Sequence, residues 1–361
     1  MSTALMAKVQ SRLEAIELPE LGQNLSRICQ VLPKADGLRV LIQQGMYSEA
    51  LSESLRNKTV AALAELANEA IDVELVVEVL TAHSLQSEKL SAVPGVKNIV
   101  AVASGKGGVG KSTTAVNIAL ALVQSGAKVG ILDADIYGPS QPQMLGVSHK
   151  RPEMHAANMI EPIPALGLKV VSMGNLVTEK TPMVWRGPMV SGALQQLLQN
   201  THWQDIDYLI IDMPPGTGDI QLTLSQAVPV SGSIVVTTPQ DIALLDARKG
   251  VEMFRKVNIP VFGVVENMST HRCSNCGHVE AIFGEKGGDS LAEEYQVALL
   301  GRLPLAMEIR VQTDEGKPSV AADPDSAVSL EYKKIAEQVA MNLWRQSLGG
   351  QSGPEISFSD D

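Results

Sequence analysis

The stretch GKGGVGKS, residues 105–112, decides the fold of this protein. It matches the pattern G-x-x-x-x-G-K-[ST] at every fixed position. An apolar run, NIVAVAS, precedes it at residues 98–104, and a helical pattern, TTAVNIALALVQ, follows it at residues 113–124. Strand, glycine-rich turn and helix in this order form the context in which the motif cradles phosphates. The alternative, a glycine-rich turn without a ligand, is disfavoured by that context.

The residue types of this loop suggest a role for each position. Glycines let the backbone curl so that its N–H groups point at phosphate oxygens, and the helix that follows adds its positive end. Lys111 would neutralise the β and γ phosphates, and the Ser112 hydroxyl would reach Mg²⁺. The expected nucleotide-binding residues of the loop are Gly105, Lys106, Gly107, Gly108, Val109, Gly110, Lys111, Ser112 and Thr113.

Two acidic motifs follow at the ends of predicted strands, LDAD at residues 132–135 and IIDMPPG at residues 210–216. Phosphoryl transfer needs one carboxylate near Mg²⁺ and a group that orients the attacking water. Asp212 suits the first task and Asp135 the second, although either could be a helix cap or a loop aspartate. Lys106 is a second lysine that an ordinary phosphate loop does not need. It is either a solvated surface lysine or a group that reaches a phosphate in a facing subunit.

From Lys97 onward, short β-branched runs alternate with helical patterns. Continuous apolar runs are typical of parallel strands covered on both faces. We therefore predict an α/β P-loop NTPase fold, a mostly parallel sheet flanked by helices and preceded by a small α+β domain. The predicted strands are Ile99–Ala103, Lys128–Leu132, Lys169–Met173, Tyr208–Ile211, Gly232–Thr237 and Val261–Val265.

The N-terminal part has its own pattern. Helices are predicted at Ala4–Ile16 and Glu49–Ala70, and strands at Gly37–Gln44 and Ile71–Leu80. The predicted domain boundaries are therefore 1–81 for the small α+β domain, 82–96 for a linker, 97–347 for the ATPase domain and 348–361 for a flexible acidic tail.

Composition excludes several classes of protein. The 361 residues carry a net charge of −11, which is unfavourable for binding nucleic acid through phosphate contacts. Three cysteines do not make a disulfide framework. Neither a signal peptide nor an apolar run of roughly 20 residues is apparent, so we expect a cytoplasmic protein that does not bind membranes.

The second chemical feature is HRCSNCGH, residues 271–278. A CxxC loop brings two thiolates to one metal centre, but zinc and iron–sulfur sites usually take four ligands. Two subunits could each donate Cys273 and Cys276 to a shared cluster, or the flanking histidines could complete a zinc site. The pair could also be a redox dithiol or an inert turn. The residues favour the shared cluster and leave the other three open.

Seven motifs occur in a characteristic order: GKGGVGKST, LDADIYGPS, WRGPM, DMPPGTGDIQLT, TTPQD, VENMS and CSNCG. Together, over about residues 95–318, they resemble the Mrp/ApbC family of iron–sulfur cluster carrier ATPases. This family belongs to the group with a deviant Walker A motif, which includes the nitrogenase iron protein and the MinD and ParA ATPases. No role is assigned to Trp185-Arg186-Gly187-Pro188.

The resemblance implies a homodimer that binds ATP and Mg²⁺ and carries a labile [4Fe–4S] cluster from an assembly scaffold to apo-proteins. Cys273 and Cys276 would bridge the cluster with their counterparts in the second subunit. Asn267 would recognise adenine. The implied catalytic residues are Lys106 acting across the dimer, Lys111, Asp135 in switch I and Asp212 in switch II.

Three rival functions each fit part of the sequence. A partition or positioning ATPase needs a membrane-binding helix or a basic surface, and neither is visible. A reductase would hold its cluster more deeply than one short CxxC loop does. A zinc-stabilised ATPase without a cluster can be separated from a carrier only by metal analysis.

Overall fold

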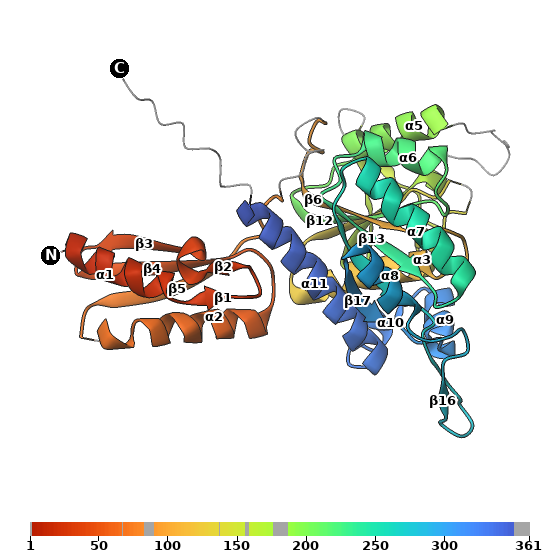
Figure 1. Cartoon of the computed structure of the whole chain (residues 1–361). Helices are drawn as coiled ribbons and strands as arrows, with labels where there is room; N and C mark the ends of the chain where they lie inside the picture. The colour runs from red at the N-terminus through yellow and green to blue at the C-terminus, as the bar shows by residue number, and fades with distance from the viewer. Residues whose placement is uncertain are drawn as a thin grey trace, which may run out of the picture. The chain divides into compact units, whose positions relative to one another are not determined.

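The computed structural model describes residues 2–66, 68–82, 90–136, 138–155, 159–175 and 187–349. The chain forms two compact units (Figure 1). Met1–His83 and Ala340–Asp361 make up the first unit, and Ser84–Val339 makes up the second. The predicted tail from residue 350, and Trp185 and Arg186 of the WRGP motif, lie outside the described residues.

An eight-stranded sheet forms the centre of the second unit. Its strand order is β10-β11-β7-β12-β6-β13-β14-β17, with every neighbouring pair parallel except β10 and β11. The strands are β6 (Val96–Ala103), β7 (Val129–Asp133), β10 (Ile163–Ala165), β11 (Leu168–Ser172), β12 (Ile206–Asp212), β13 (Gly232–Thr237), β14 (Val261–Glu266) and β17 (Ala298–Arg302). All six predicted strands are confirmed to within a few residues. The two that prediction missed, β10 and β17, are the short strands at the edges.

The central strands are buried on both faces, as their continuous apolar runs predict. Every residue of β7, β12 and β13 is buried. Alternate residues of β6, such as Ala101 and Ala103, join one core cluster with apolar side chains of α5, α6, α7 and α8. The residues between them face the opposite layer, where α3 packs on β6, β7 and β12. The helices concerned are α3 (Lys111–Ser125), α5 (Gly187–Asn200), α6 (Asp219–Ala227), α7 (Asp241–Lys256) and α8 (Gly287–Tyr295).

Shorter elements complete the second unit. Two strands, β8 (Glu153–His155) and β9 (Met159–Glu161), pair as an antiparallel ribbon, and β15 (His271–Arg272) pairs with β16 (Val279–Glu280) as another. The remaining helices are α4 (Gln141–Met144), α9 (Met307–Asp314), α10 (Ser319–Ala322) and the first part of α11 (Ala327–Gly349).

The first unit is a small α+β fold. Its sheet has the order β3-β4-β5, with β3 (Cys29–Lys34) antiparallel and β5 (Ile71–Val77) parallel to β4 (Gly37–Gln44). The prediction for β4 is confirmed residue for residue. Sequence reasoning missed β3 because Pro33 and exposed positions blur its pattern.

Helices α1 (Ser2–Glu14) and α2 (Glu49–Ala62) pack near this sheet, and β1 (Glu17–Leu18) pairs with β2 (Gln23–Asn24). The predicted second helix was too long. The observed helix, α2, ends at Ala62 and is followed by a 3₁₀ turn at Ala64–Leu66. Its start is fixed by Ser48, whose side chain accepts a hydrogen bond from the Leu51 N–H.

The end of the chain belongs to the first unit. Trp344 in α11 is almost completely buried, and the Arg345 guanidinium donates a hydrogen bond to the Glu20 carbonyl. The sequence pattern assigns residues up to 347 to the nucleotide domain, whereas the structure groups Ala340 onward with the N-terminal unit. A helical pattern shows where a helix runs but not which core its apolar face joins.

Candidate nucleotide site and cysteine hairpin

The phosphate loop lies between the end of β6 and the start of α3, as the motif predicts. Gly108 and Gly110 have φ angles of 82° and 85°, which side-chain-bearing residues rarely adopt. A Cβ on Gly110 would lie 2.1 Å from Nδ2 of Asn267. At the start of the loop, a Cβ on Gly105 would lie 2.2 Å from the backbone oxygen of Asp246 in α7. Backbone conformation and close packing therefore both demand glycine in this loop.

Lys111 begins α3 and is buried inside the loop. Its Nζ pairs with Oδ1 of Asp212 and donates a hydrogen bond of 3.1 Å to Oγ of Ser112. Asp212 ends β12 and is completely buried, so the two charges neutralise each other away from water. An ammonium group can pair with a carboxylate or with phosphate oxygens, so a nucleotide bound in the loop would compete with Asp212 for Lys111.

A second carboxylate, Asp133, lies beside Asp212. The two residues are paired in register at the ends of neighbouring strands β7 and β12, and both are fully buried. Burial and the charge of Asp212 raise the pKa of Asp133 to about 7, although the N–H groups of Asp135, Ser140 and Gln141 donate to its oxygens. Sequence reasoning named Asp135 of the same LDAD motif as a site residue and did not consider Asp133.

Asp135 itself lies two residues beyond the strand and is half-buried. Its Oδ1 accepts a hydrogen bond of 3.2 Å from the Gly138 N–H. The strand order explains why Asp133 was missed. Only the pairing of β7 with β12 reveals that Asp133, not Asp135, is the register neighbour of Asp212.

Gln141, at the start of α4, is the second residue that sequence reasoning missed. Its side chain is completely buried and donates from Nε2 to Oδ2 of Asp212 at 2.8 Å and to the Ser112 carbonyl at 3.0 Å. Its Oε1 is buried and has no hydrogen-bond donor among the described residues. No motif marks a glutamine at this position, because its role follows from the packing of α4 against the loop.

The donor set fits a hydrated magnesium ion. The Ser112 hydroxyl and the carboxylates of Asp133 and Asp212 are hard oxygen donors, the class that Mg²⁺ prefers. The unpartnered Gln141 oxygen is a further acceptor in the same cluster.

Lys106 is part of the phosphate loop, and Asn267 contacts the loop from the end of β14. Lys106 is half-exposed, and its carbonyl accepts a hydrogen bond of 2.9 Å from Oγ of Ser104. Among the residues that the structure describes, its ammonium group forms no ion pair. Asn267 directly follows β14 and donates from Nδ2 to the Val109 carbonyl at 2.8 Å. The structure thus brings both predicted residues to the phosphate loop. Thr113 is in the first turn of α3, where its carbonyl accepts a hydrogen bond from Asn117.

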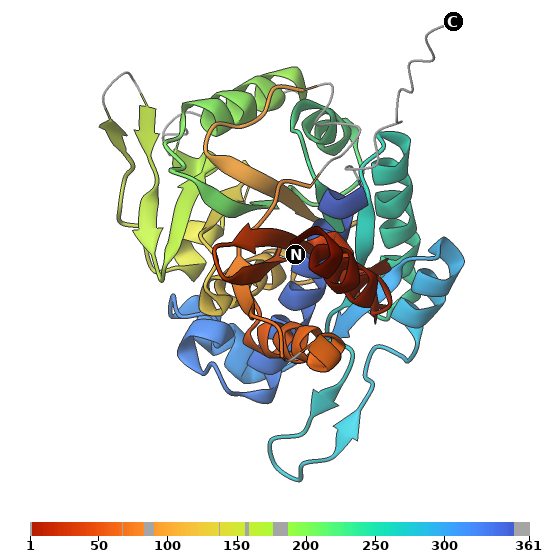
Figure 2. The same cartoon turned by 90° about the vertical axis from the view of Figure 1, so that its left-hand side faces the viewer.

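The CxxC motif forms the tip of the β15–β16 hairpin. Figures 1 and 2 show this hairpin projecting away from the sheet. The Cys273 N–H donates to the His278 carbonyl at 2.8 Å, and the Gly277 N–H donates to the Cys273 carbonyl at 2.9 Å. Cys276 is exposed and Cys273 is half-exposed. Hydrogen bonds from the N–H groups of Cys276 and Asn275 lower the pKa of Cys273, so the loop favours a thiolate.

The structure does not group the flanking histidines with the cysteines among the described residues. Nδ1 of His271 lies 3.1 Å from the Leu305 carbonyl, to which it donates a hydrogen bond. Within the described part of the chain, no three His, Cys, Asp or Glu side chains are grouped to hold a metal. The third cysteine, Cys29, is buried in the first unit, and burial raises its pKa to about 12.

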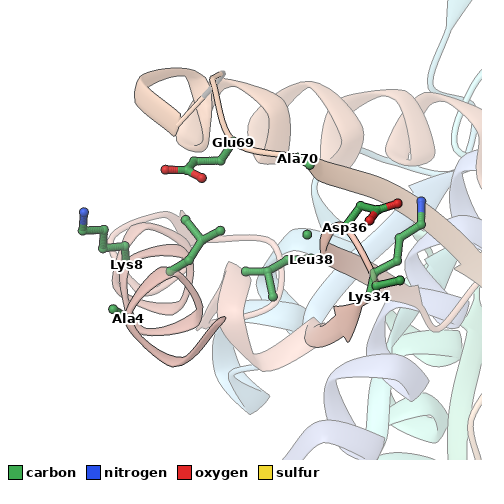
Figure 3. Close-up of a pocket in the computed structure, with 10 residues that line it drawn as sticks. Ala4, Lys8, Lys34, Asp36, Leu38, Glu69 and Ala70 are labelled. Atoms are coloured by element: carbon green, nitrogen blue, oxygen red, sulfur yellow. The ribbon is translucent and has the colours of Figure 1, made fainter. Parts of the chain in front are cut away.

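The first unit contains a cavity of about 590 Å³ between α1, the β3–β4 turn and the segment before β5 (Figure 3). Charged and apolar side chains line it together, and Lys34 of its lining pairs with Asp72. None of its lining residues is a cysteine or a histidine, so it offers no ligand for a cluster. Across the described residues, no helix is long and apolar enough to cross a bilayer.

Comparison with solved structures supports the fold. The chain is 34% identical to a nucleotide-binding protein from Archaeoglobus fulgidus solved in complex with ADP, with a TM-score of 0.56, covering 62% of this chain and 88% of that one. The cell-division ATPase MinD of Pyrococcus furiosus shares the fold at 22% identity and a TM-score of 0.51, covering 67% of this chain and 98% of that one.

The chain is also similar to curated proteins, one of them over almost its whole length. It is 49% identical to an iron–sulfur cluster carrier protein of Escherichia coli K12 over 98% of this chain and 96% of that one. A protein of the same name from Pseudomonas fragi is 64% identical over 72% of this chain and 90% of that one. The mouse iron–sulfur cluster transfer protein NUBPL is 49% identical over 71% of this chain and 80% of that one. Residues 95–340 match the family model described as ParA, NUBPL iron-transfer P-loop NTPase. The chain therefore belongs to the NUBPL family of iron-transfer P-loop NTPases, which confirms the family that its sequence motifs indicate.

Proposed function

We propose that this protein is a cytoplasmic ATPase that carries a labile [4Fe–4S] cluster between two copies of itself and transfers it to apo-proteins. Its cargo would be held by Cys273 and Cys276 of each copy and received from an assembly scaffold. Membership of the iron-transfer family supports the carrier role.

The main structural support for the proposal is the contact between Asn267 and the phosphate loop. Asn267 bonds the phosphate loop, and the same segment reaches Cys273 six residues later. The β14 strand therefore ends in a residue that touches the nucleotide loop and then runs into the cysteine hairpin. A change in the loop that moves Asn267 has a short, continuous route to the cluster ligands.

The nucleotide site supplies the parts that hydrolysis needs. Lys111 would leave Asp212 for the phosphates, and Ser112, Asp212 and Asp133 would hold the magnesium ion and its water. That ion supplies positive charge against the phosphates when it is bound. Asp135 would orient the attacking water, and Lys106 would contact the nucleotide of the facing copy. We expect hydrolysis to be slow.

The exposure of the hairpin cysteines suits a cluster that is released to another protein. Two thiolates per chain fill half of the four positions that a cubane cluster needs, and a second copy would supply the others. The exposed Cys276 leaves its sulfur open to an incoming apo-protein. This arrangement favours a transferable cluster over a buried redox centre.

Anaerobic reconstitution with iron and sulfide tests the proposal. The wild type should take up about four irons per pair of chains with absorbance near about 400 nm, as expected of a cysteine-ligated cluster. Cys273→Ala/Cys276→Ala should lose the iron and the absorbance, whereas Cys29→Ala should keep both, because its thiol lies in the other unit.

A separate experiment tests whether ATP affects cluster transfer. Lys111→Ala should still bind a reconstituted cluster but should lose any effect of ATP on its transfer to an apo-protein. One zinc per chain with no iron uptake would overturn the carrier proposal. An unchanged ATP effect in the lysine variant would overturn only the coupling.

A further inference from the structure

Gln141 touches three parts of the nucleotide site at once. Its main-chain N–H donates to Oδ2 of Asp133 at 3.0 Å. Its side-chain Nε2 donates to Oδ2 of Asp212 at 2.8 Å and to the Ser112 carbonyl at 3.0 Å. A single buried residue therefore links the ends of β7 and β12 to the phosphate loop.

The orientation of its amide is fixed by chemistry. Both side-chain partners, a carboxylate and a carbonyl, are acceptors only, so the NH₂ group must face them. The amide oxygen is then the free end, buried and without a donor among the described residues. Buried polar side-chain atoms are mostly hydrogen-bonded, and this oxygen is one of several among the described residues that have no partner within the protein, so it is open to a donor that the protein itself does not provide.

The surroundings indicate which donor fits. The side-chain amide bonds the Asp212 carboxylate and the Ser112 carbonyl, and the main-chain N–H of the same residue bonds the Asp133 carboxylate. Negative oxygens of this kind attract a hydrated divalent cation, and water on such a cation is a strong donor. An anion or a carbonyl could not fill this role, because neither has a hydrogen to donate to the amide oxygen.

We propose that Gln141 is a positioning residue for magnesium-bound nucleotide: its amide nitrogen holds Asp212 in place, and its amide oxygen accepts a hydrogen bond from a water ligand of the metal. The inference rests on the nucleotide site of the proposed function and adds a residue to it. It also explains why α4 begins with a buried amide between the two acidic strand ends.

The test measures the affinity of a fluorescent ADP analogue with saturating Mg²⁺ and, separately, with excess EDTA. Gln141→Met keeps the side-chain length but removes both polar atoms. Losing the hydrogen bond between a water on the metal ion and the amide oxygen should reduce the Mg²⁺-dependent gain in affinity by about tenfold or more. The affinity in EDTA should change by less than about threefold, because the phosphate contacts of the loop remain.

Two further variants separate positioning from folding. Gln141→Glu keeps an acceptor oxygen but loses the amide nitrogen that holds Asp212, so it should retain only part of the Mg²⁺-dependent gain. Gln44→Met removes another completely buried glutamine that donates to two backbone carbonyls, Met46 and Ser48, but lies in the first unit. It should lower the midpoint of thermal unfolding while leaving the Mg²⁺-dependent gain unchanged.

Three results would overturn the role proposed for Gln141. If Gln141→Met weakens binding equally with Mg²⁺ and with EDTA, the residue is structural and the inference is wrong. If the Mg²⁺-dependent gain is unchanged, the inference is also wrong. If the wild type itself shows no Mg²⁺-dependent binding, the proposed nucleotide function fails together with it.

Discussion

Asn267 donates its side-chain hydrogen bond to the Val109 carbonyl, joining the end of β14 to the middle of the phosphate loop. The contact depends on Gly110, because any Cβ there would lie 2.1 Å from the donating nitrogen. The loop that binds phosphate and the segment that leads to the cysteines are thus in direct contact at a position where only glycine fits.

Gly110→Ala should therefore destabilise the protein by about 2–4 kcal/mol. The cost combines a left-handed backbone, with φ at 85°, and the collision with Asn267. Denaturant unfolding of the two proteins measures it. Gly107→Ala is the matched control in the same loop, because a Cβ there meets nothing within 4 Å, and its stability should stay within about 0.5 kcal/mol of wild type. Equal effects of the two changes would contradict the packing argument.

Asp212→Asn should make stability unusually dependent on nucleotide. The change leaves Lys111 buried without its counter-charge, at a cost of about 3–5 kcal/mol. Phosphate groups can replace that charge, so ADP should raise the unfolding midpoint of the variant more than that of the wild type. Parallel titrations with ADP in the absence of Mg²⁺ check this, and an equal rise in both proteins would show that Lys111 does not exchange partners.

Asp133 should make the protein less stable as pH rises towards neutrality. Its pKa is about 7 in the folded protein against 3.8 for an ordinary aspartate, so the folded state keeps a proton that the unfolded chain has lost between those values. Stability contributed by this group is complete below about pH 4, falls through the window and is constant above about pH 7.

Asp133→Asn removes that dependence. From about pH 4 to pH 7, the free energy of unfolding of the variant should rise relative to that of the wild type by a few kcal/mol, at about 1.4 kcal/mol per pKa unit. Urea unfolding of both proteins at a series of pH values tests the difference. Curves that stay parallel across this window would show that Asp133 is ionised throughout.

The three cysteines should differ sharply in reactivity. Backbone N–H groups lower the pKa of Cys273, whereas burial raises that of Cys29 to about 12. Iodoacetamide at about pH 7.5 should label the hairpin pair in the native protein and spare Cys29 until urea is added. Peptide mapping by mass spectrometry gives the order, and rapid labelling of Cys29 without denaturant would mean that the first unit is open.

Local sequence predicted much of this protein for a clear reason. The phosphate loop needs glycines at fixed positions and a lysine at its end, and these requirements are local, so they show in eight residues. The central strands β7, β12 and β13 could be found because both their faces are buried, which demands apolar residues at every position. The edge strands β10 and β17 are short and partly exposed, and their pattern was too weak to find.

The neighbouring positions of Asp133 and Asp212 could not be predicted from the sequence. The sequence places Asp133 and Asp212 about eighty residues apart, and only the order of the strands brings them side by side. Gln141 carries no motif, and its hydrogen bonds to Asp212 and Ser112 arise from packing between separate elements.

The sequence by itself determined the nucleotide loop, the parallel-strand core, the cysteine pair and, through its ordered motifs, the family. Tertiary structure decided which carboxylate neighbours Asp212, which side chain touches Val109 and which core the end of α11 joins. The division has a physical cause. Backbone conformation and burial of a strand are set by adjacent residues, whereas strand order and side-chain partners are set by packing between segments far apart in the chain.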